Sequence, residues 1–158
     1  MLVALLAVLL ACGKIKEKIA EKVTEKAVEQ ASGQDVDLDN GRVHVKDDKG
    51  NTAEWGAGAK LPNEWPKTLG PYPGSQLIAS YAARSNQKLS GSISMKTGDG
   101  SEKVVAHYTK ALSDFQLTRD MNMNGNQIKI FQKDGRTVTL NVVAKDAETQ
   151  ATVVLANF

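Results

Sequence analysis

The chain has 158 residues, of which 41% are hydrophobic and 24% are charged, and its formal net charge is +2. This length allows one small domain with tethers, and the composition is that of a globular protein and not of a disordered one. The near-balanced charge gives no basic stripe for nucleic acid, and 5% aromatic residues leave few rings for stacking on bases or sugars. A single cysteine excludes an intramolecular disulfide, a thiolate zinc cluster and a CxxC redox centre.

An unbroken apolar run, residues 2–11, opens the chain, and Cys12 follows it directly. The run has about half of the roughly 20 residues that a membrane-spanning helix needs, and its length is typical of the core of a signal peptide. Residues 9–12 read Leu-Leu-Ala-Cys and resemble the bacterial lipobox. This resemblance implies that residues 1–11 are removed as a signal peptide. It also implies that Cys12 carries diacylglycerol and further acyl chains such as palmitate.

One feature departs from this pattern, because no Lys or Arg precedes Cys12, whereas a signal peptide begins with one. We therefore expect the translation start to lie upstream of Met1. A buried N-terminal strand or helix with an incidental thiol is disfavoured, because no polar or turn residue interrupts the apolar run. Gly13 stands where an Asp would, by resemblance to Gram-negative lipoproteins, favour the inner membrane. We expect an exported, membrane-anchored protein, on the periplasmic side of the outer membrane where the host has two membranes.

Residues 14–29 repeat a Lys-x-x-Glu motif four times and predict a helix that ends near Gly33. Lys and Glu attract each other at i,i+3, but like charges repel each other at i,i+4. The two contributions to helix stability are similar in size and roughly cancel. An apolar stripe recurs every four residues, at Ile15, Ile19, Val23 and Ala27. This period drifts around a 3.6-residue helix and disfavours a coiled coil. We expect residues 12–33 to form a lipidated, solvated helical tether; the alternative is a helix that lies on the membrane surface.

Two alternating five-residue segments, 35–39 and 42–46, flank Asn40-Gly41, which is the strongest short hairpin signal. A charged turn then leads to a third short strand. The sequence therefore predicts a short β-meander within residues 34–58.

The aspartates of this meander invite a calcium hypothesis, but they lack the spacing D-x-[DN]-x-[DN]-G-x₅-E of a calcium loop. Strand alternation already explains them as a solvated face. His44 alternates with two valines and has no partner His or Cys in the pattern. We expect neither a metal site nor a cofactor.

All four prolines lie within residues 59–75, which we expect to be an extended joint with a Pro-Gly turn. Trp65 and Tyr72 belong to this joint, and the favoured hypothesis is that they cap the edge of the core. The alternative is a candidate binding surface formed by Trp55, Trp65 and Tyr72.

Residues 76–158 predict a ββαββββ domain. Its strands are expected at 76–83, 89–96, 116–121, 127–133, 136–144 and 150–157. Before the helix, residues 99–102 have the form of a capping box, with Asp99 as N-cap and Glu102 at N3. The helix presents one apolar stripe, with Val104, Val105, Tyr108, Ala111 and Leu112.

Short hairpin connections favour an antiparallel sheet with one helix packed on one face, an α+β fold. The strand residues expected to face the helix are Ile128, Ile130, Val138, Leu140, Val142, Val153 and Leu155. The residues expected on the opposite, polar face are Lys129, Gln132, Arg136, Thr137, Thr139 and Asn141. That face is expected to be solvated or to serve as a binding surface.

Several of these segments resemble an uncharacterised family of bacterial lipoproteins and secreted proteins. The shared features are an Ala/Glu/Lys helix ending at Gly, a Val/Asp hairpin, a Leu-Pro-x-x-x-Pro joint, a Tyr-Pro-Gly turn and a helix ending near His/Phe-Tyr. Here they lie at residues 25–33, 35–46, 61–66, 72–74 and 97–112. Because each feature is structural, the resemblance carries over no functional residue except Cys12.

No motif of catalysis occurs: GxSxG, HExxH, the P-loop and the Rossmann pattern are absent. His44 and His107 are the two histidines, and no nucleophile or carboxylate partner is visible for either. We therefore expect no enzyme, and a hydrolase is the least favoured function. The favoured function is a binding module that contacts another envelope protein, a glycan or a small molecule. The alternative is a structural spacer or assembly subunit of an envelope complex.

Overall fold

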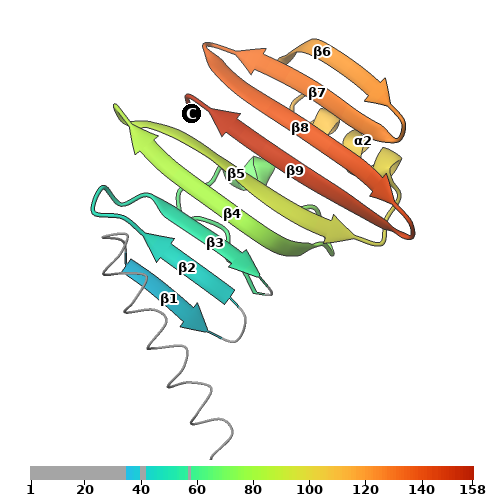
Figure 1. Ribbon diagram of the computed structural model, residues 1–158. Helices are drawn as coiled ribbons and strands as arrows, with labels where there is room; N and C mark the ends of the chain where they lie inside the picture. The colour runs from blue at the N-terminus through green and yellow to red at the C-terminus, as the bar shows by residue number, and fades with distance from the viewer. Residues whose placement is uncertain (1–34, 40–41, 57) are drawn as a thin grey trace, which may run out of the picture.

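The structure, a computed structural model, describes residues 35–39, 42–56 and 58–158 (Figure 1). The strands are β1 (Asp35–Asp39), β2 (Arg42–Lys46), β3 (Thr52–Gly56), β4 (Gln76–Ser85), β5 (Lys88–Thr97), β6 (Gln116–Met123), β7 (Asn126–Lys133), β8 (Arg136–Lys145) and β9 (Glu148–Ala156). The helical elements are the 3₁₀-helix η1 (Lys67–Leu69) and the α-helix α2 (Ser101–Ala111). The expected signal peptide, Cys12, the tether helix and the Asn40-Gly41 turn lie outside the described residues.

These strands form one antiparallel sheet in the order β1-β2-β3-β4-β5-β9-β8-β7-β6. Within the described residues an antiparallel sheet with one α-helix is therefore confirmed, and the expected strands are found with ends that differ by one or two residues. β3 pairs with β4, so the meander and the C-terminal strands share a single sheet. β9 inserts between β5 and β8, which places the last strand at the centre (Figure 1).

The hairpin turns after β6 and β7 follow the chemistry of their residues. Asn124 and Gly125 have φ values of 50° and 80°, and Asp134 and Gly135 have values of 51° and 76°. Tight hairpins need two successive left-handed residues, a conformation that Asn, Asp and Gly tolerate best. These dipeptides therefore fix where β6, β7 and β8 end and begin.

The core lies between α2 and the centre of the sheet, where α2 packs on β8 and β9. In α2, Val104, Tyr108 and Leu112 are almost fully buried, as the apolar stripe predicts. The strands contribute alternate residues to the same core: Ile93, Met95, Val138, Leu140, Val142, Val153 and Leu155. Each buried aliphatic side chain contributes about 1.5–3 kcal/mol of hydrophobic stabilisation, so this layer is the main source of stability.

The proline-rich joint covers the part of the sheet that α2 does not reach. Trp65 is 3% exposed, and its Nε1 donates a hydrogen bond to the carbonyl oxygen of Leu69 at 2.7 Å. Ser80 Oγ of β4 donates to the carbonyl oxygen of Lys60 at 2.8 Å. The indole hydrogen bond thus closes the joint on itself, and the Ser80 hydrogen bond fixes the backbone of the joint to β4.

The expectation that Ile128 and Ile130 face α2 is wrong. Phe131 is 2% exposed in the core, and strand alternation places Ile128 and Ile130 on the other face. Lys129 takes the helix side, where its Nζ donates to Asp120 Oδ2 at 2.5 Å. β7 carries apolar residues at both alternating sets of positions, so its periodicity alone does not say which set faces inward.

The expected capping box is also wrong. The N-cap of α2 is Gly100, and no side chain caps the helix. The Asp99 carboxylate accepts hydrogen bonds from the Tyr72 hydroxyl at 3.0 Å and from Lys103 Nζ at 2.9 Å. Asp99 therefore connects the joint to the first turn of α2.

The Asp99 cluster predicts a pH dependence of stability. Hydrogen bonds from Lys103 and then from Tyr72 hold the pKa of Asp99 below its ordinary value. Its contribution to stability is therefore complete above that ordinary value and is lost as pH falls through the lowered pKa. We expect Asp99→Asn to flatten the acid side of the stability curve below about pH 4, measured by urea unfolding at successive pH values. Asp146→Asn, in the exposed turn after β8, is the matched control. Parallel curves for Asp99→Asn and the unsubstituted protein would contradict this role.

Candidate functional site

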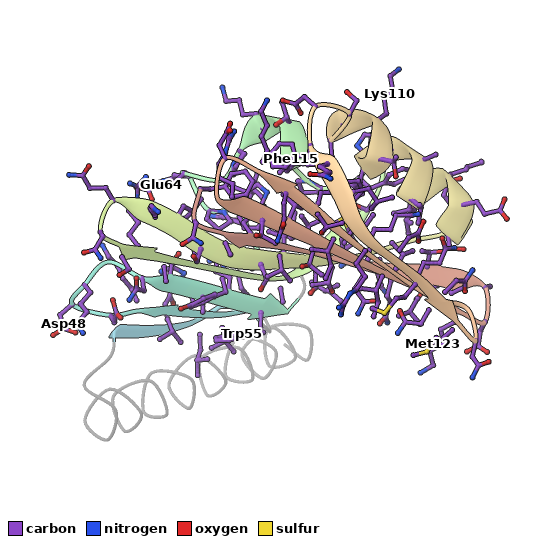
Figure 2. All side chains as sticks on the ribbon, turned by 90° about the horizontal axis from the view of Figure 1, so that it is seen from above. Asp48, Trp55, Glu64, Lys110, Phe115 and Met123 are labelled. Atoms are coloured by element: carbon purple, nitrogen blue, oxygen red, sulfur yellow. The ribbon has the colours of Figure 1, made fainter. Side chains whose placement is uncertain are left out.

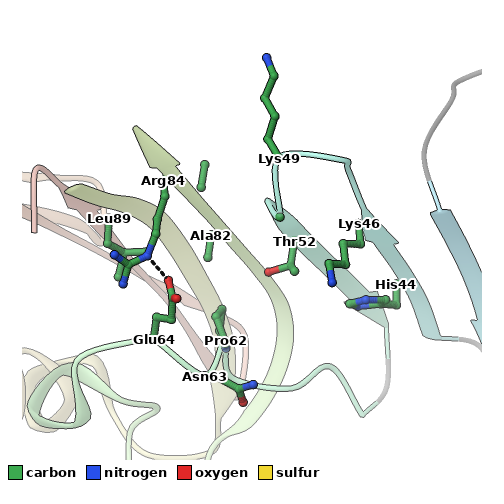
Figure 3. Close-up of a pocket in the computed structure, with 12 residues that line it drawn as sticks. His44, Lys46, Lys49, Thr52, Pro62, Asn63, Glu64, Ala82, Arg84 and Leu89 are labelled. Carbon is green, nitrogen blue, oxygen red and sulfur yellow. Dashed lines mark hydrogen bonds and ion pairs between the residues drawn. The ribbon is translucent and has the colours of Figure 1, made fainter. Parts of the chain in front are cut away.

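An open cleft of about 470 Å³ lies on the helix side of the sheet, between the β2–β3 hairpin and the joint (Figure 3). His44 and Thr52 line it from the strands, and Pro62 lines it from the joint. The charged side chains of its lining are Lys46, Lys49, Arg84 and Glu64. Because three of these are cations, the cleft favours an anion.

His44 is held in this cleft by a carboxylate. Its Nδ1 lies 3.0 Å from Oε1 of Glu54, and Oε2 of Glu54 accepts a hydrogen bond from the backbone N–H of Lys60 at 2.6 Å. Glu54 therefore ties β2 and β3 to the start of the joint. Among the residues that the structure describes, no group of three His, Cys, Asp or Glu side chains is placed to hold a metal ion.

Arg84 and Glu64 line both this cleft and a second one. Arg84 Nε at the end of β4 donates a close, charge-assisted hydrogen bond to Glu64 Oε2 of the joint (Figure 3). The two side chains are 50% and 51% exposed. An exposed ion pair of this kind is worth only about 0–1 kcal/mol. A ligand anion can therefore take the place of Glu64 at little cost.

The second cleft, of about 440 Å³, lies beyond this ion pair at the C-terminal end of α2. Its apolar lining includes Leu69, Leu89 and Leu112. Phe115 and Phe158 supply two near-parallel rings, with centroids 6.2 Å apart and planes 9° apart. Leu89 and Phe158 exchange two backbone hydrogen bonds of 2.6 and 2.9 Å, so the chain end is held beside β5.

Arg136 adds a cation to this aromatic wall. Its guanidinium carbon lies 5.4 Å from the ring centroid of Phe115 and 5.6 Å from that of Phe158, within the range of cation–π attraction. The expectation that Arg136 belongs to the opposite polar face is wrong, because it pairs with Lys133 on the helix side. Its ion pair with Asp134 is long, at 3.6 Å, and the Asp134 side chain is 76% exposed.

Asp114 is the second carboxylate of this cleft, and it is already paired. Lys133 Nζ donates to Asp114 Oδ2 at 2.6 Å, and this hydrogen bond is the largest cause that lowers the pKa of Asp114. The Lys133 ammonium also lies 5.9 Å from the ring centroid of Phe115. The negative charge of Asp114 is therefore compensated within the site by Lys133, while Arg84 pairs with Glu64 and Arg136 makes a long ion pair with Asp134.

The two clefts together combine a basic half with an apolar and aromatic half. Both volumes lie in the range of about 300–1,000 Å³ that small-molecule sites occupy. Arg84 lines both clefts, and Arg136 lines the second one beside the rings of Phe115 and Phe158. This arrangement suits an organic anion whose carboxylate, sulfonate or phosphate meets a guanidinium group and whose apolar part contacts the phenyl rings.

The residues that the sequence marked as a candidate binding surface do not come together. Trp55 is 47% exposed and belongs to the sheet face away from α2, whereas Trp65 is buried in the core. Tyr72 is partly buried, and its ring meets that of His107 edge to face at 5.2 Å. Trp65 is thus part of the core itself, and Tyr72 packs against the core edge, where the favoured hypothesis placed both residues. Cys12 lies outside the described residues.

Sequence reasoning missed the residues that meet in the clefts. They come from separate segments: Glu64 from the joint, Arg84 from β4, Phe115 from the turn after α2, Arg136 from β8 and Phe158 from the chain end. Each is an ordinary residue in its local pattern, and no spacing links them. No signal in the sequence distinguishes them, because the small surplus of Lys and Arg is spread along the chain.

The chain was compared with known families, curated proteins and solved structures. A family model described as START domain-like matches residues 77–151, which run from β4 into β9. No curated protein and no solved structure matches the chain. Of the helices in the described ranges, none has the length and apolar character needed to cross a bilayer.

Proposed function

We propose that this chain is a lipid-anchored binding protein of the bacterial cell envelope, and that it takes a small organic anion into the clefts around Arg84. The lipobox-like residues before Cys12 support the anchor, since their apolar run is too short to span a bilayer. The clefts support the binding role. Acyl chains on Cys12 would keep the domain at the membrane while its clefts stay open to solvent.

The observation that carries the binding role is the position of the Arg84–Glu64 ion pair between a basic cleft and an aromatic one. Such a pair holds the guanidinium group in place while the site is empty. An anion with an apolar part can replace Glu64 and bury its rings against Phe115 and Phe158. His44 lies in the basic cleft with its Nδ1 paired to Glu54, so its ring is held in place beside the bound anion.

This proposal predicts that binding of 1-anilinonaphthalene-8-sulfonate, an aromatic anion of suitable size, depends on Arg84. Charge-assisted hydrogen bonds are worth roughly 1.5–3 kcal/mol, so Arg84→Gln or Arg136→Gln should weaken binding about tenfold or more. Fluorescence titration measures the dissociation constant. N-phenyl-1-naphthylamine has the same rings without the sulfonate, and its binding should change much less.

The matched control is Arg119→Gln, which removes an exposed arginine of β6 on the face away from α2. We expect this variant to bind the sulfonate as the unsubstituted protein does. Equal affinities for Arg84→Gln and Arg119→Gln would show that the dye binds elsewhere and would reject the cleft as its site.

A further inference from the structure

The face of the sheet that carries the apolar residues is not the same at the centre of the sheet and at its N-terminal strands. In β5, β8 and β9 the buried apolar residues face α2, and Val154 of β9 is exposed on the other face. In the first strands the cross-strand register puts Val43 opposite Trp55 and Val45 opposite Ala53, and Tyr81 of β4 lies opposite Ala53. These five residues share the face away from α2, and we call them the N-terminal apolar face. Polar residues such as His44 and Glu54 occupy the helix side there.

No helix of the described residues lies on the N-terminal apolar face. Figure 2 shows Trp55 on the side of the sheet away from α2. Trp55 and Tyr81 are 47% and 46% exposed, and Val43 and Val45 are half-buried. Grouped exposed apolar side chains on a sheet face mark a surface that contacts a partner. The N-terminal apolar face is therefore a candidate docking surface.

We propose that residues 14–33 of the same chain occupy this surface, folding back as an amphipathic helix onto the N-terminal apolar face. The stripe that it would present is Ile15, Ile19, Val23 and Ala27. Only Gln34 separates Gly33 from β1, the strand at this edge of the sheet. Gly33 can adopt the left-handed conformation that ends a helix and reverses the chain. The proposal does not depend on ligand binding at Arg84.

The dimensions of the two surfaces agree. A helix of 20 residues is about 30 Å long. The strands β1 to β3 have five residues each, or roughly 17 Å, and four neighbouring strands span about 14 Å at 4.8 Å spacing. One helix can therefore cross the whole face, and because its four-residue apolar period drifts around the helix, Ile19 and Val23 at the middle of the stripe are the residues that it would place on the face.

The short connection also favours this occupant over a second copy or a bilayer. A segment tied to the surface by one residue has an effective local concentration of about millimolar or above, which a separate molecule reaches only at high concentration. Docking would bring Cys12 to the first strands of the sheet. The domain would then sit close to the bilayer instead of a helix length away from it.

Thiol labelling tests the docking in the chain from residue 12 onward, with Cys12→Ser removing the natural thiol. Val45→Cys reports on the N-terminal apolar face, and Lys46→Cys, the next residue, reports on the opposite face. We expect a soluble maleimide to label Cys at 45 about tenfold more slowly than at 46. Ile19→Gln with Val23→Gln should abolish most of this difference. Glu21→Gln with Glu25→Gln, on the opposite side of the expected helix, should leave it unchanged.

Circular dichroism and thermal unfolding of every variant confirm that the sheet is intact. Equal labelling rates at 45 and 46 in the Cys12→Ser chain would overturn the proposal. So would protection that the Ile19 and Val23 changes do not relieve. Protection that grows with protein concentration would assign the face to a second copy, and protection that needs phosphatidylglycerol vesicles would assign it to a membrane; both results reject intramolecular docking.

Discussion

Cys12→Ala should move the protein from the membrane fraction to the soluble fraction. The apolar run at residues 2–11 is about half the length of a spanning helix. We therefore expect that this run does not hold the protein at the membrane when residue 12 carries no acyl chains. Each buried methylene of an acyl chain contributes about 0.8 kcal/mol, and two or three chains on Cys12 give durable attachment. Fractionation of carbonate-washed membranes measures the change.

A palmitate analogue with an alkyne should label the unsubstituted protein and not Cys12→Ala, and mass measurement of the mature N-terminus should show the added chains. Gly13→Asp is the control, because it changes the residue after the anchor and leaves the thiol in place. It should stay membrane-bound and labelled. A natural product that begins at Met1 with an unmodified thiol would contradict the anchor.

The order of elements was predictable because the local signals agree with the final fold. Turn dipeptides such as Asp134-Gly135 adopt the left-handed backbone that their residues tolerate. The stripe of α2 that includes Val104, Tyr108 and Leu112 is buried as its 3.6-residue period requires. Both are short-range properties, so the sequence alone contains them.

The wrong predictions concern residues whose local sequence allows two roles, and contacts with other parts of the chain determine which role each residue has. Asp99 has the sequence of an N-cap, but Tyr72, 27 residues away, donates to its carboxylate. Ile130 belongs to an alternating apolar pair, but Phe131 beside it fills the core. Where both alternating sets of a strand carry apolar residues, as in β7, the pattern does not say which set faces inward, and packing against the rest of the fold decides.

The clefts were not predictable for the same reason. Arg84 and Glu64 are 20 residues apart, and their contact depends on how the joint lies over β4. Phe158 reaches the site only because β9 inserts beside β5 and its end pairs with Leu89. No periodicity in the sequence predicts the contacts of Arg84 with Glu64 or of Phe158 with Leu89. The site therefore follows from the topology of the sheet.

Gly91→Ala should destabilise the protein by about 3 kcal/mol, as expected for overpacking at a site that cannot relax. Gly91 is buried in β5, and a methyl group there would press into the backbone carbonyl oxygen of Tyr81 and lie 3.2 Å from the Trp65 ring. The obstacle is backbone, so β4 itself must move. Urea unfolding measures the loss, and near-ultraviolet circular dichroism reports on the surroundings of Trp65.

The same change should also weaken ligand binding at the candidate site. Trp65 directly follows Glu64 in the joint, so a shift of its indole would move Glu64 as well. If the indole is lifted from Gly91, Glu64 no longer meets Arg84 in the same geometry, and binding of the anilinonaphthalene sulfonate should change with it. Gly98→Ala is the control, since a methyl group there meets nothing within 4 Å. A Gly91→Ala protein as stable as Gly98→Ala would mean that β4 and β5 are not packed through position 91, and the joint would then need another support to place Glu64 at Arg84.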